Sequence, residues 1–179
     1  VANKNKTMTS FIGDGLQSFT IPKIVEKVCS IRGLTTAYTP YQPERSQGTL
    51  QTLWLYQSAM SQITGFEAIN ASLYERSTCL FEALMCATRL VRKSTTVIVC
   101  ESIYPGDKEV LETIKAQTFL NIIYAPIDKE SGTTDLEKLK DLINSNENLA
   151  AVAIPQINAF GCIEPFNEIT DITQNANLQ

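Results

Sequence analysis

Short apolar runs alternate with segments of helical spacing from residue 66 to the end of the chain, and this order constrains the fold more than any other feature. Residues 95–100 read Thr-Thr-Val-Ile-Val-Cys, a β-branched run that is typical of a strand covered on both faces. Comparable runs at 66–70, 119–124 and 149–154 predict three further strands. Strands that alternate with helices form parallel sheets with helices on both faces. The sequence therefore predicts an α/β fold with a mostly parallel sheet of four strands.

Four helices are expected between and after these strands. The first, residues 77–92, is apolar on most sides, which predicts that it is buried between layers. Pro105 opens the second, because proline is tolerated in the first turn of a helix. Thr134 and Glu137 form a capping box that starts the third helix, and the fourth lies within residues 163–176.

The segment that precedes the alternating region combines a predicted helix with a long polar loop. Residues 49–64 have helical spacing, and Gly65 ends that helix. Residues 35–48 lack a regular period, and a loop of this length in an α/β chain is usually functional. Its two prolines lower the entropy cost of holding polar groups in place. We interpret it as the lining of a small-molecule site or as an interface loop, with an ordinary connection as the alternative. Its candidate residues are Tyr38, Thr39, Tyr41, Gln42 and Glu44.

Two turns that follow predicted strands are further candidates. Residues 72–78 precede a helix, and hydroxyl and N–H groups at a helix N-terminus bind phosphate in α/β proteins. Phosphate loops normally contain glycine, however, so N-capping by Ser or Thr is the simpler interpretation. The second turn follows the last strand, where ligands bind in open α/β sheets, although an Asn-x-x-Gly turn explains it equally well. The candidate residues are Ser72, Tyr74, Ser77, Thr78 and Asn158.

The amino-acid composition argues against several classes of function. The 179 residues contain no histidine, which argues against Ser–His triads and most catalytic zinc sites, and we predict neither a catalytic residue nor a metal site. A net charge of −4 with scattered basic residues argues against nucleic-acid binding, and no apolar run approaches the roughly 20 residues of a membrane span. Five cysteines without a Cys-x-x-Cys pair fit neither a disulfide framework nor a zinc knuckle. Cys79 and Cys86 are therefore expected to be core residues of a cytoplasmic protein.

Several segments carry a resemblance more specific than their chemistry. Residues 36–44 read Thr-Ala-Tyr-Thr-Pro-Tyr-Gln-Pro-Glu, and residues 46–51 read Ser-Gln-Gly-Thr-Leu-Gln. Segments at 10–15, 64–74 and 158–164 agree in the same order. The sequence resembles the P-proteins of the glycine cleavage system, in the form of subunit 1 of the two-subunit glycine dehydrogenases (decarboxylating).

This resemblance implies an oxidoreductase of glycine catabolism with the fold type I, aspartate-aminotransferase-like architecture of pyridoxal-phosphate-dependent transferases. With subunit 2, such a subunit decarboxylates glycine, and the aminomethyl group passes to the lipoylated H-protein. Pyridoxal phosphate is expected on subunit 2, with none bound covalently by this chain. Residues 38–44 would then face the substrate pocket of the partner, and this chain alone is expected to be inactive.

The same resemblance sets expectations for domains and assembly. Residues 1–48 would hold an N-terminal helix and the active-site or interface loop, and residues 49–179 part of the large domain, with the small C-terminal domain absent. Four strands cannot complete the larger sheet of the family, so we expect an exposed sheet edge and self-association.

The sequence departs from the family pattern at several positions, and one of these departures supports an alternative function. The family turn Tyr-Asp-Gly-Ala-Thr reads Tyr-Glu-Arg-Ser-Thr at residues 74–78, and a His-Pro pair reads Tyr104-Pro105. Arg76 and the missing glycine would fit a diverged or truncated paralogue with a structural or regulatory role.

Overall fold

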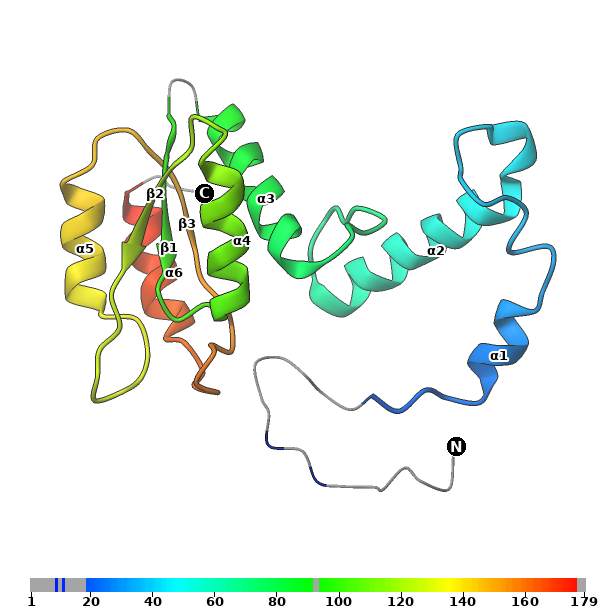
Figure 1. Cartoon of the computed structure of the whole chain (residues 1–179), viewed down its shortest axis with the longest axis horizontal. Helices are drawn as coiled ribbons and strands as arrows, with labels where there is room; N and C mark the ends of the chain where they lie inside the picture. Colours follow the sequence, from blue (N-terminus) through cyan, green and yellow to red (C-terminus); the bar gives the residue numbers. More distant parts are fainter. Residues whose placement is uncertain (1–8, 10, 12–18, 92–93, 177–179) are drawn as a thin grey trace. The chain divides into compact units, whose positions relative to one another are not determined.

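The computed structural model describes residues 9, 11, 19–91 and 94–176, and the segment at 10–15 therefore lies almost entirely outside the described residues. Of the described residues, 19–73 form one compact unit and 74–176 another. We call them the helical unit and the α/β unit (Figure 1).

A parallel three-stranded sheet forms the centre of the α/β unit. Its strands are β1 (Thr96–Cys100), β2 (Asn121–Ala125) and β3 (Leu149–Ala153), in the order β2-β1-β3. The β-branched run predicted as a strand is the central one, and four of its five residues are buried. The parallel α/β sheet predicted from the sequence is confirmed, with three strands in the described residues instead of four.

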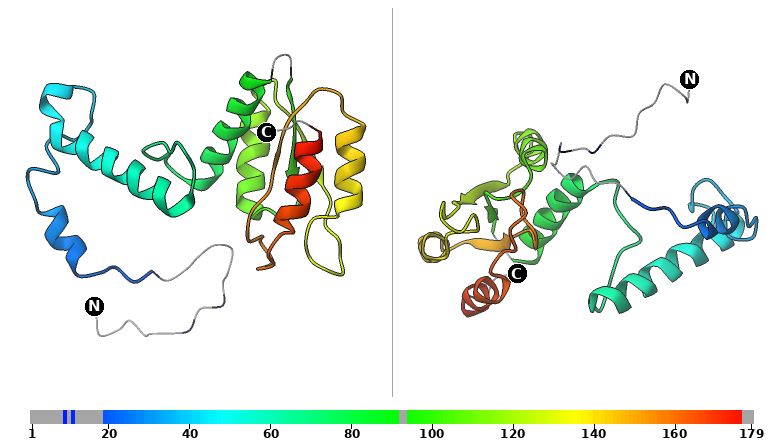
Figure 2. Two further views of the ribbon diagram at one scale, coloured as in Figure 1. Left: turned by 180° about the vertical axis from the view of Figure 1, so that it is seen from behind. Right: turned by 90° about the horizontal axis from the view of Figure 1, so that it is seen from below.

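Two helices cover each face of this sheet (Figure 2). They are α3 (Arg76–Leu90) and α4 (Pro105–Lys115) on one face, and α5 (Leu136–Asn144) and α6 (Phe166–Asn175) on the other. Successive strand residues point to opposite faces. Val97 and Val99 therefore join one buried cluster, whereas Ile98 packs in the other with Leu139 and Ile169.

The strand predicted at residues 66–70 does not form. Side chains of the preceding helix hydrogen-bond to its backbone instead. The Ser61 hydroxyl donates to the carbonyl of Phe66 at 2.5 Å, and the Gln57 side chain donates to the carbonyl of Ile69. Carbonyl groups satisfied in this way need no neighbouring strand.

The predicted capping box of α5 is also wrong by one residue. Asp135, not Thr134, caps the helix, and its carboxylate accepts a hydrogen bond from the backbone N–H of Lys138 at 3.1 Å. Thr134 is buried, and its N–H donates to the Glu164 carboxylate at 2.8 Å. The start of α4 at Pro105 is confirmed.

Helix α3 is half covered, not buried on all sides as its composition predicted. Cys79, Ala83, Cys86 and Leu90 recur at helical spacing and form an exposed stripe, because the sheet covers only the opposite side. The expectation that Cys79 and Cys86 are core residues is therefore wrong. Cys100, at the end of β1, is buried.

The helical unit contains α1 (Ile24–Cys29), the short 3-10 turn η2 (Pro43–Arg45) and α2 (Gln47–Thr64). Gly65 ends α2 with a positive φ of 78°, as predicted. The hydroxyl of Thr36 accepts hydrogen bonds from the N–H groups of Gly48 (3.1 Å) and Thr49 (3.3 Å), which anchors the irregular loop to the start of α2. A Cβ at position 48 would lie 1.8 Å from the carbonyl oxygen of Gly33, so only glycine fits there.

Candidate functional site at the carboxyl ends of the strands

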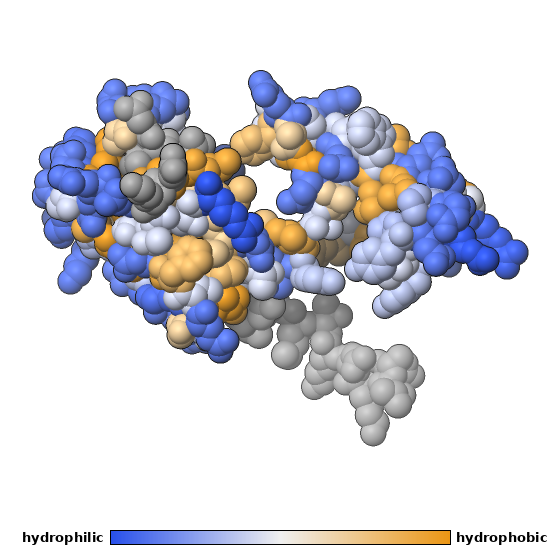
Figure 3. Space-filling model, turned by 90° about the horizontal axis from the view of Figure 1, so that it is seen from above, coloured by the Kyte–Doolittle hydropathy of each residue, from blue (hydrophilic) through white to orange (hydrophobic). Residues whose placement is uncertain are grey.

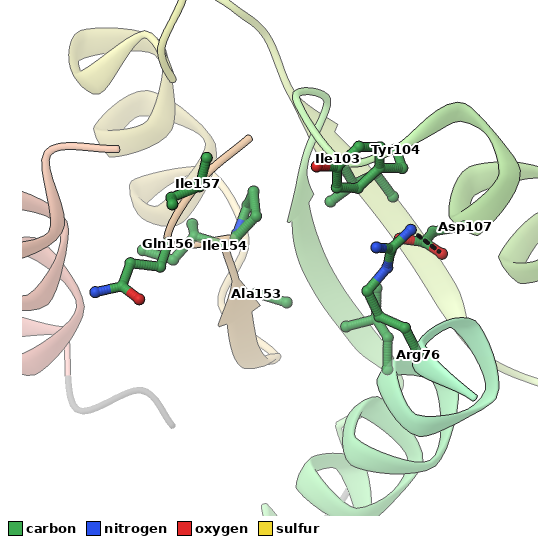
Figure 4. Close-up of a pocket in the computed structure, with 10 residues that line it drawn as sticks. Arg76, Ile103, Tyr104, Asp107, Ala153, Ile154, Gln156 and Ile157 are labelled. Carbon is green, nitrogen blue, oxygen red and sulfur yellow. Dashed lines mark hydrogen bonds and ion pairs between the residues drawn. The ribbon is translucent and has the colours of Figure 1, made fainter. Parts of the chain in front are cut away.

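A pocket of about 340 Å³ opens at the carboxyl ends of β1 and β3. From β1 the chain passes through α4 to β2 on one side, and α5 then returns it to β3 on the other side of β1. The segments after β1 and β3 therefore diverge, and such a switch point is where open α/β sheets bind ligands. The walls come from the first turns of α3, from residues 103–107 and from residues 153–157 (Figure 4).

An ion pair forms the polar end of this pocket (Figure 4). The Arg76 guanidinium donates to the Asp107 carboxylate through Nε at 2.6 Å and Nη2 at 3.2 Å. The Ser77 hydroxyl donates to the same carboxylate at 2.6 Å, and the guanidinium lies 4.2 Å from the centre of the Tyr104 ring. Asp107 is buried, and these partners satisfy its charge.

The rest of the pocket wall is mostly apolar, and the titratable side chains among its described lining residues are Arg76, Tyr104 and Asp107. The apolar lining residues are Leu80, Ile103, Ala153, Ile154, Pro155 and Ile157. The pocket can hold an apolar group beside a fixed charge pair, but none of the lining side chains is placed as a nucleophile with its own base. Across the described ranges, no three metal-binding side chains gather into a site.

The N-terminus of α3, beside this pocket, is capped by its own chain. The Glu75 carboxylate accepts hydrogen bonds from the N–H groups of Ser77 at 2.6 Å and Thr78 at 2.8 Å. Hydrogen bonding by Thr78, aided by Ser77, lowers the pKa of Glu75 from 4.5 to about 2. A carboxylate thus takes the position in which a helix N-terminus would hold an external anion.

A second buried carboxylate, that of Glu164, joins the loops at this end of the sheet. It accepts hydrogen bonds from the Ser102 hydroxyl at 2.6 Å, the Asn158 amide at 2.8 Å and the Thr134 N–H at 2.8 Å. Burial raises the pKa of Glu164, but these hydrogen bonds outweigh burial and lower it below its ordinary value. The carboxylate connects the segments that follow β1, β2 and β3.

The side chain of Asn158 forms hydrogen bonds that hold this cluster of loops together. Its side chain is fully buried, and its amide also donates to the carbonyl of Gly132 at 2.8 Å. Its carbonyl oxygen accepts from the N–H groups of Phe160 and Cys162, which forms the turn that the Asn-x-x-Gly pattern predicted. Its proposed role toward a ligand stays a prediction.

The other candidate residues of the α/β unit divide between buried and exposed positions. Ser77 is buried beside Asp107, whereas Tyr74 is fully exposed and Thr78 is half-buried. Ser72, in the helical unit, is exposed and has a φ of 132°, in the left-handed region that favours glycine.

The loop candidates lie in the helical unit, whereas the pocket belongs to the α/β unit. All five loop residues are exposed. The carbonyl of Thr39 accepts from the buried Ser46 hydroxyl at 3.1 Å, and Gln42 is the N-cap residue of η2. Their side-chain roles stay predictions.

Sequence reasoning missed Asp107 and Ser102. Asp107 stands in the first turn of α4, where an acidic residue is common because it interacts favourably with the helix dipole. Nothing local indicates a partner 31 residues earlier in the chain. Ser102 is the second residue after the central strand, and that position was the available signal.

Comparison with known proteins identifies the family. The family model of the glycine cleavage system P-protein matches residues 1–179. The chain belongs to this family.

Curated relatives of this P-protein chain include the probable glycine dehydrogenase (decarboxylating) subunit 1 of Legionella pneumophila (strain Corby), which is 40% identical over 94% of the chain. The protein of the same name from Nitrosospira multiformis is 36% identical over 97% of the chain. The chain spans 37% and 38% of the length of these two relatives.

Solved structures agree with the family. The glycine decarboxylase (P-protein) of the glycine cleavage system, in inhibitor-bound form, matches 99% of the chain and 39% of its own, with a TM-score of 0.82 and 29% identity. C-DES with glycine covalently linked to its PLP cofactor matches 86% of the chain and 40% of its own, with a TM-score of 0.56 and 13% identity, which shows a shared fold. The fold is therefore that of the fold type I enzymes, which use pyridoxal phosphate.

The pocket residues of this P-protein chain do not fit pyridoxal phosphate. A phosphate at the start of α3 would need the N–H groups of Ser77 and Thr78, which the Glu75 carboxylate already occupies. The neighbouring Arg76 is held by Asp107. No lysine is among the described lining residues, so this pocket offers no amine for a Schiff base. We assign no step of cofactor chemistry to it.

Proposed function

We propose that this chain is part of subunit 1 of a glycine dehydrogenase (decarboxylating), which acts with subunit 2 in the glycine cleavage system. The observation that carries the proposal is 40% identity over 94% of the chain to a relative of that name. The TM-score of 0.82 to a glycine decarboxylase supports it. Both comparisons favour this function over that of a diverged structural or regulatory paralogue.

In the proposed complex, subunit 2 holds pyridoxal phosphate and glycine, and the lipoylated H-protein receives the aminomethyl group. The self-capped α3 and the pocket without lysine support a division of labour in which this chain does not hold the cofactor. We place the complex in the cytoplasm, and the five free cysteines fit a reducing compartment. No helix in the described part of the chain is long and apolar enough to span a membrane.

Within this division of labour, the chain supplies the loop at residues 38–44 to the substrate pocket of subunit 2. Tyr38 and Tyr41 are almost fully exposed, although aromatic rings are usually packed. Pro40 and Pro43 stiffen the loop, and η2 and the start of α2 anchor it. Exposed aromatic and amide groups on a stiff loop suit a site that is completed by another subunit.

A mixing assay tests the proposal with the full-length subunit that contains this chain. Glycine-dependent carbon dioxide exchange should require subunit 2 and the lipoylated H-protein. Tyr41→Phe or Gln42→Ala should lower the exchange rate about tenfold, equivalent to about 1.4 kcal/mol of lost transition-state stabilisation. Gln174→Ala, an exposed position on α6, should leave the rate unchanged.

Two results would count against the proposal at different levels. Full exchange activity in both loop variants would remove the proposed roles of the loop but leave the function. No exchange in the unsubstituted mixture, or a Schiff-base absorption band when pyridoxal phosphate is added to this chain alone, would contradict the proposed division of labour.

A further inference from the structure

The proposed function assigns no ligand to the pocket at the carboxyl ends of β1 and β3, yet this pocket has the features of a binding site. Its volume of about 340 Å³ is within the range of small-molecule sites, and all of its lining residues belong to the α/β unit. Single exposed apolar side chains, in orange in Figure 3, occur at several places on the surface and are ordinary in soluble proteins. The pocket differs from them because its apolar side chains gather around one cavity.

Apolar side chains face one another across this cavity. Figure 4 shows Ala153 and Ile154, at the end of β3, on one side, and Ile103 and Tyr104, which follow β1, on the other. Leu80 of α3 adds to the wall. A ligand that removes these side chains from water gains free energy in proportion to the apolar area that it covers. The body of the ligand is therefore expected to be apolar.

The polar end of the cavity presents a cation more than an anion. The side chain of Arg76 is 56% exposed, whereas that of Asp107 is 7% exposed. Two hydrogen bonds to Asp107 hold the guanidinium, which also lies 4.2 Å from the centre of the Tyr104 ring. A molecule that enters the cavity therefore meets the edge of a fixed guanidinium, a group that only donates hydrogen bonds. Its matching group is a hydrogen-bond acceptor.

This acceptor should carry no charge of its own. A ligand carboxylate would be attracted to Arg76 but repelled by the Asp107 carboxylate that already neutralises it. It would also lose hydration on entering an apolar cavity, which costs an uncharged carbonyl oxygen far less. A cationic ligand would meet the guanidinium before the buried carboxylate. A carbonyl oxygen is therefore the group that suits this end of the cavity.

A segment of polypeptide suits the cavity less well than a small molecule. Each residue of such a segment brings a backbone N–H and C=O that need partners when they are buried. Apart from the ion pair, the polar side chains of the described lining are Tyr104 and Gln156, and Figure 4 shows Gln156 pointing away from the guanidinium. A molecule with a single polar group at one end matches this lining better.

We propose that this pocket binds a small uncharged carbonyl compound with an apolar body, such as an aromatic amide or ketone. The carbonyl oxygen accepts a hydrogen bond from the Arg76 guanidinium, and the body lies between Ile103 and Ile154. This site is separate from the substrate contact proposed above, because the loop at residues 38–44 belongs to the helical unit.

Phenylacetamide is the probe, with phenylacetate and 2-phenylethylamine as anionic and cationic compounds of similar shape. The full-length subunit that contains this chain is labelled with ¹³C at the isoleucine δ1 methyl groups and titrated with each compound by NMR. Phenylacetamide should shift the resonances of Ile103 and Ile157 in a saturable way. It should bind at least about fivefold more tightly than either charged compound, because it loses less hydration. Ile143 and Ile169, which pack on the other face of the sheet, should not shift.

A substitution that fills the cavity locates the binding. Ala153→Leu should weaken phenylacetamide binding at least about tenfold, because the larger side chain takes the place of the ligand. The matched control Ala83→Leu, at an exposed position of α3, should bind normally. Ile157→Trp, at a lining position that is 55% exposed, should have the same effect as Ala153→Leu and keeps the test valid if that variant does not fold.

Three results would overturn the proposal. The absence of saturable shifts at Ile103 would show that the pocket is closed or filled in the full-length subunit. Tighter binding of phenylacetate or 2-phenylethylamine would contradict the uncharged class of ligand. Unchanged binding in both Ala153→Leu and Ile157→Trp would place the probe elsewhere. None of these results bears on glycine-dependent exchange with subunit 2, so the proposed function is tested separately.

Discussion

The side chain of Asp107 is only 7% exposed, whereas the side chain of its ion-pair partner Arg76 is 56% exposed. The carboxylate is therefore buried, and the guanidinium stays in contact with solvent. Arg76→Ala would leave the carboxylate buried with Ser77 as its remaining partner. Asp107→Asn would instead release a guanidinium that water can solvate. We expect Arg76→Ala to lower the free energy of unfolding by about 2 kcal/mol and Asp107→Asn by about 1 kcal/mol, after allowance for solvent screening.

Urea unfolding of the two single variants and the double variant measures this difference. The double variant should be no less stable than Arg76→Ala, because no buried charge remains unpaired in it. Lys138→Ala, which removes an exposed ion pair with Asp135, is the control and should change stability by less than about 0.5 kcal/mol. A larger loss for Asp107→Asn than for Arg76→Ala would contradict this account.

The residues of the site were only partly predictable from the sequence. Arg76 is noticeable because it replaces a small residue of the family turn, and Asn158 because it follows a strand. Asp107 carries no local signal and Ser102 only its position after a strand, since their partners Arg76 and Glu164 lie 31 and 62 residues away in the chain. Buried polar networks of this kind are fixed by tertiary packing and not by local pattern.

At the scale of elements, the N-terminal turn of α3 should depend on pH through Glu75. Its pKa of about 2 in the folded chain lies below the ordinary value of 4.5. A lowered pKa means that the ionised carboxylate stabilises the fold above about pH 4.5, and that this stabilisation is lost as the pH falls toward 2. Glu75→Gln should therefore destabilise the chain at pH 6 but not at pH 2.

Thermal unfolding of the wild type and Glu75→Gln between pH 2 and pH 6 checks this expectation. Comparing the two proteins at each pH removes the contribution of the other carboxyl groups. Glu137→Gln serves as a control, because that side chain is exposed and pairs with Lys140 on the helix surface. A difference between wild type and Glu75→Gln that does not change with pH would exclude the carboxylate cap as its cause.

The elements themselves were largely predictable, because hydrophobic periodicity reports burial directly. The run at 95–100 became the central strand, and Pro105 opened α4. The failures arose where side chains satisfied the backbone. Gln57 and Ser61 hydrogen-bond to the segment predicted as a strand, and Asp135 provides the cap expected from Thr134. Such side-chain bonds compete with regular structure and leave no periodic signal.

On the scale of the whole molecule, the sheet has two edges among the described residues. Both β2 and β3 pair with β1 on one side only. β3 reads Leu-Ala-Ala-Val-Ala, which contains neither proline nor a charged side chain. Soluble proteins normally protect an edge strand with such residues, because an exposed edge offers unpaired N–H and C=O groups to another chain. The edge at β3 has neither of these protecting residue types. Leu149, Ala150 and Ala151 are buried, so the open part of this edge is its carboxyl end, at Val152 and Ala153.

We accordingly expect the 179-residue chain to self-associate through this edge at micromolar concentration. Light scattering on the eluting chain should give a mass that rises with concentration, because edge pairing adds backbone hydrogen bonds and covers apolar surface. Leu55→Glu should not prevent this rise, since it alters an exposed residue of α2 and not the sheet. A monomer mass at all concentrations would show that the edge is protected in another way.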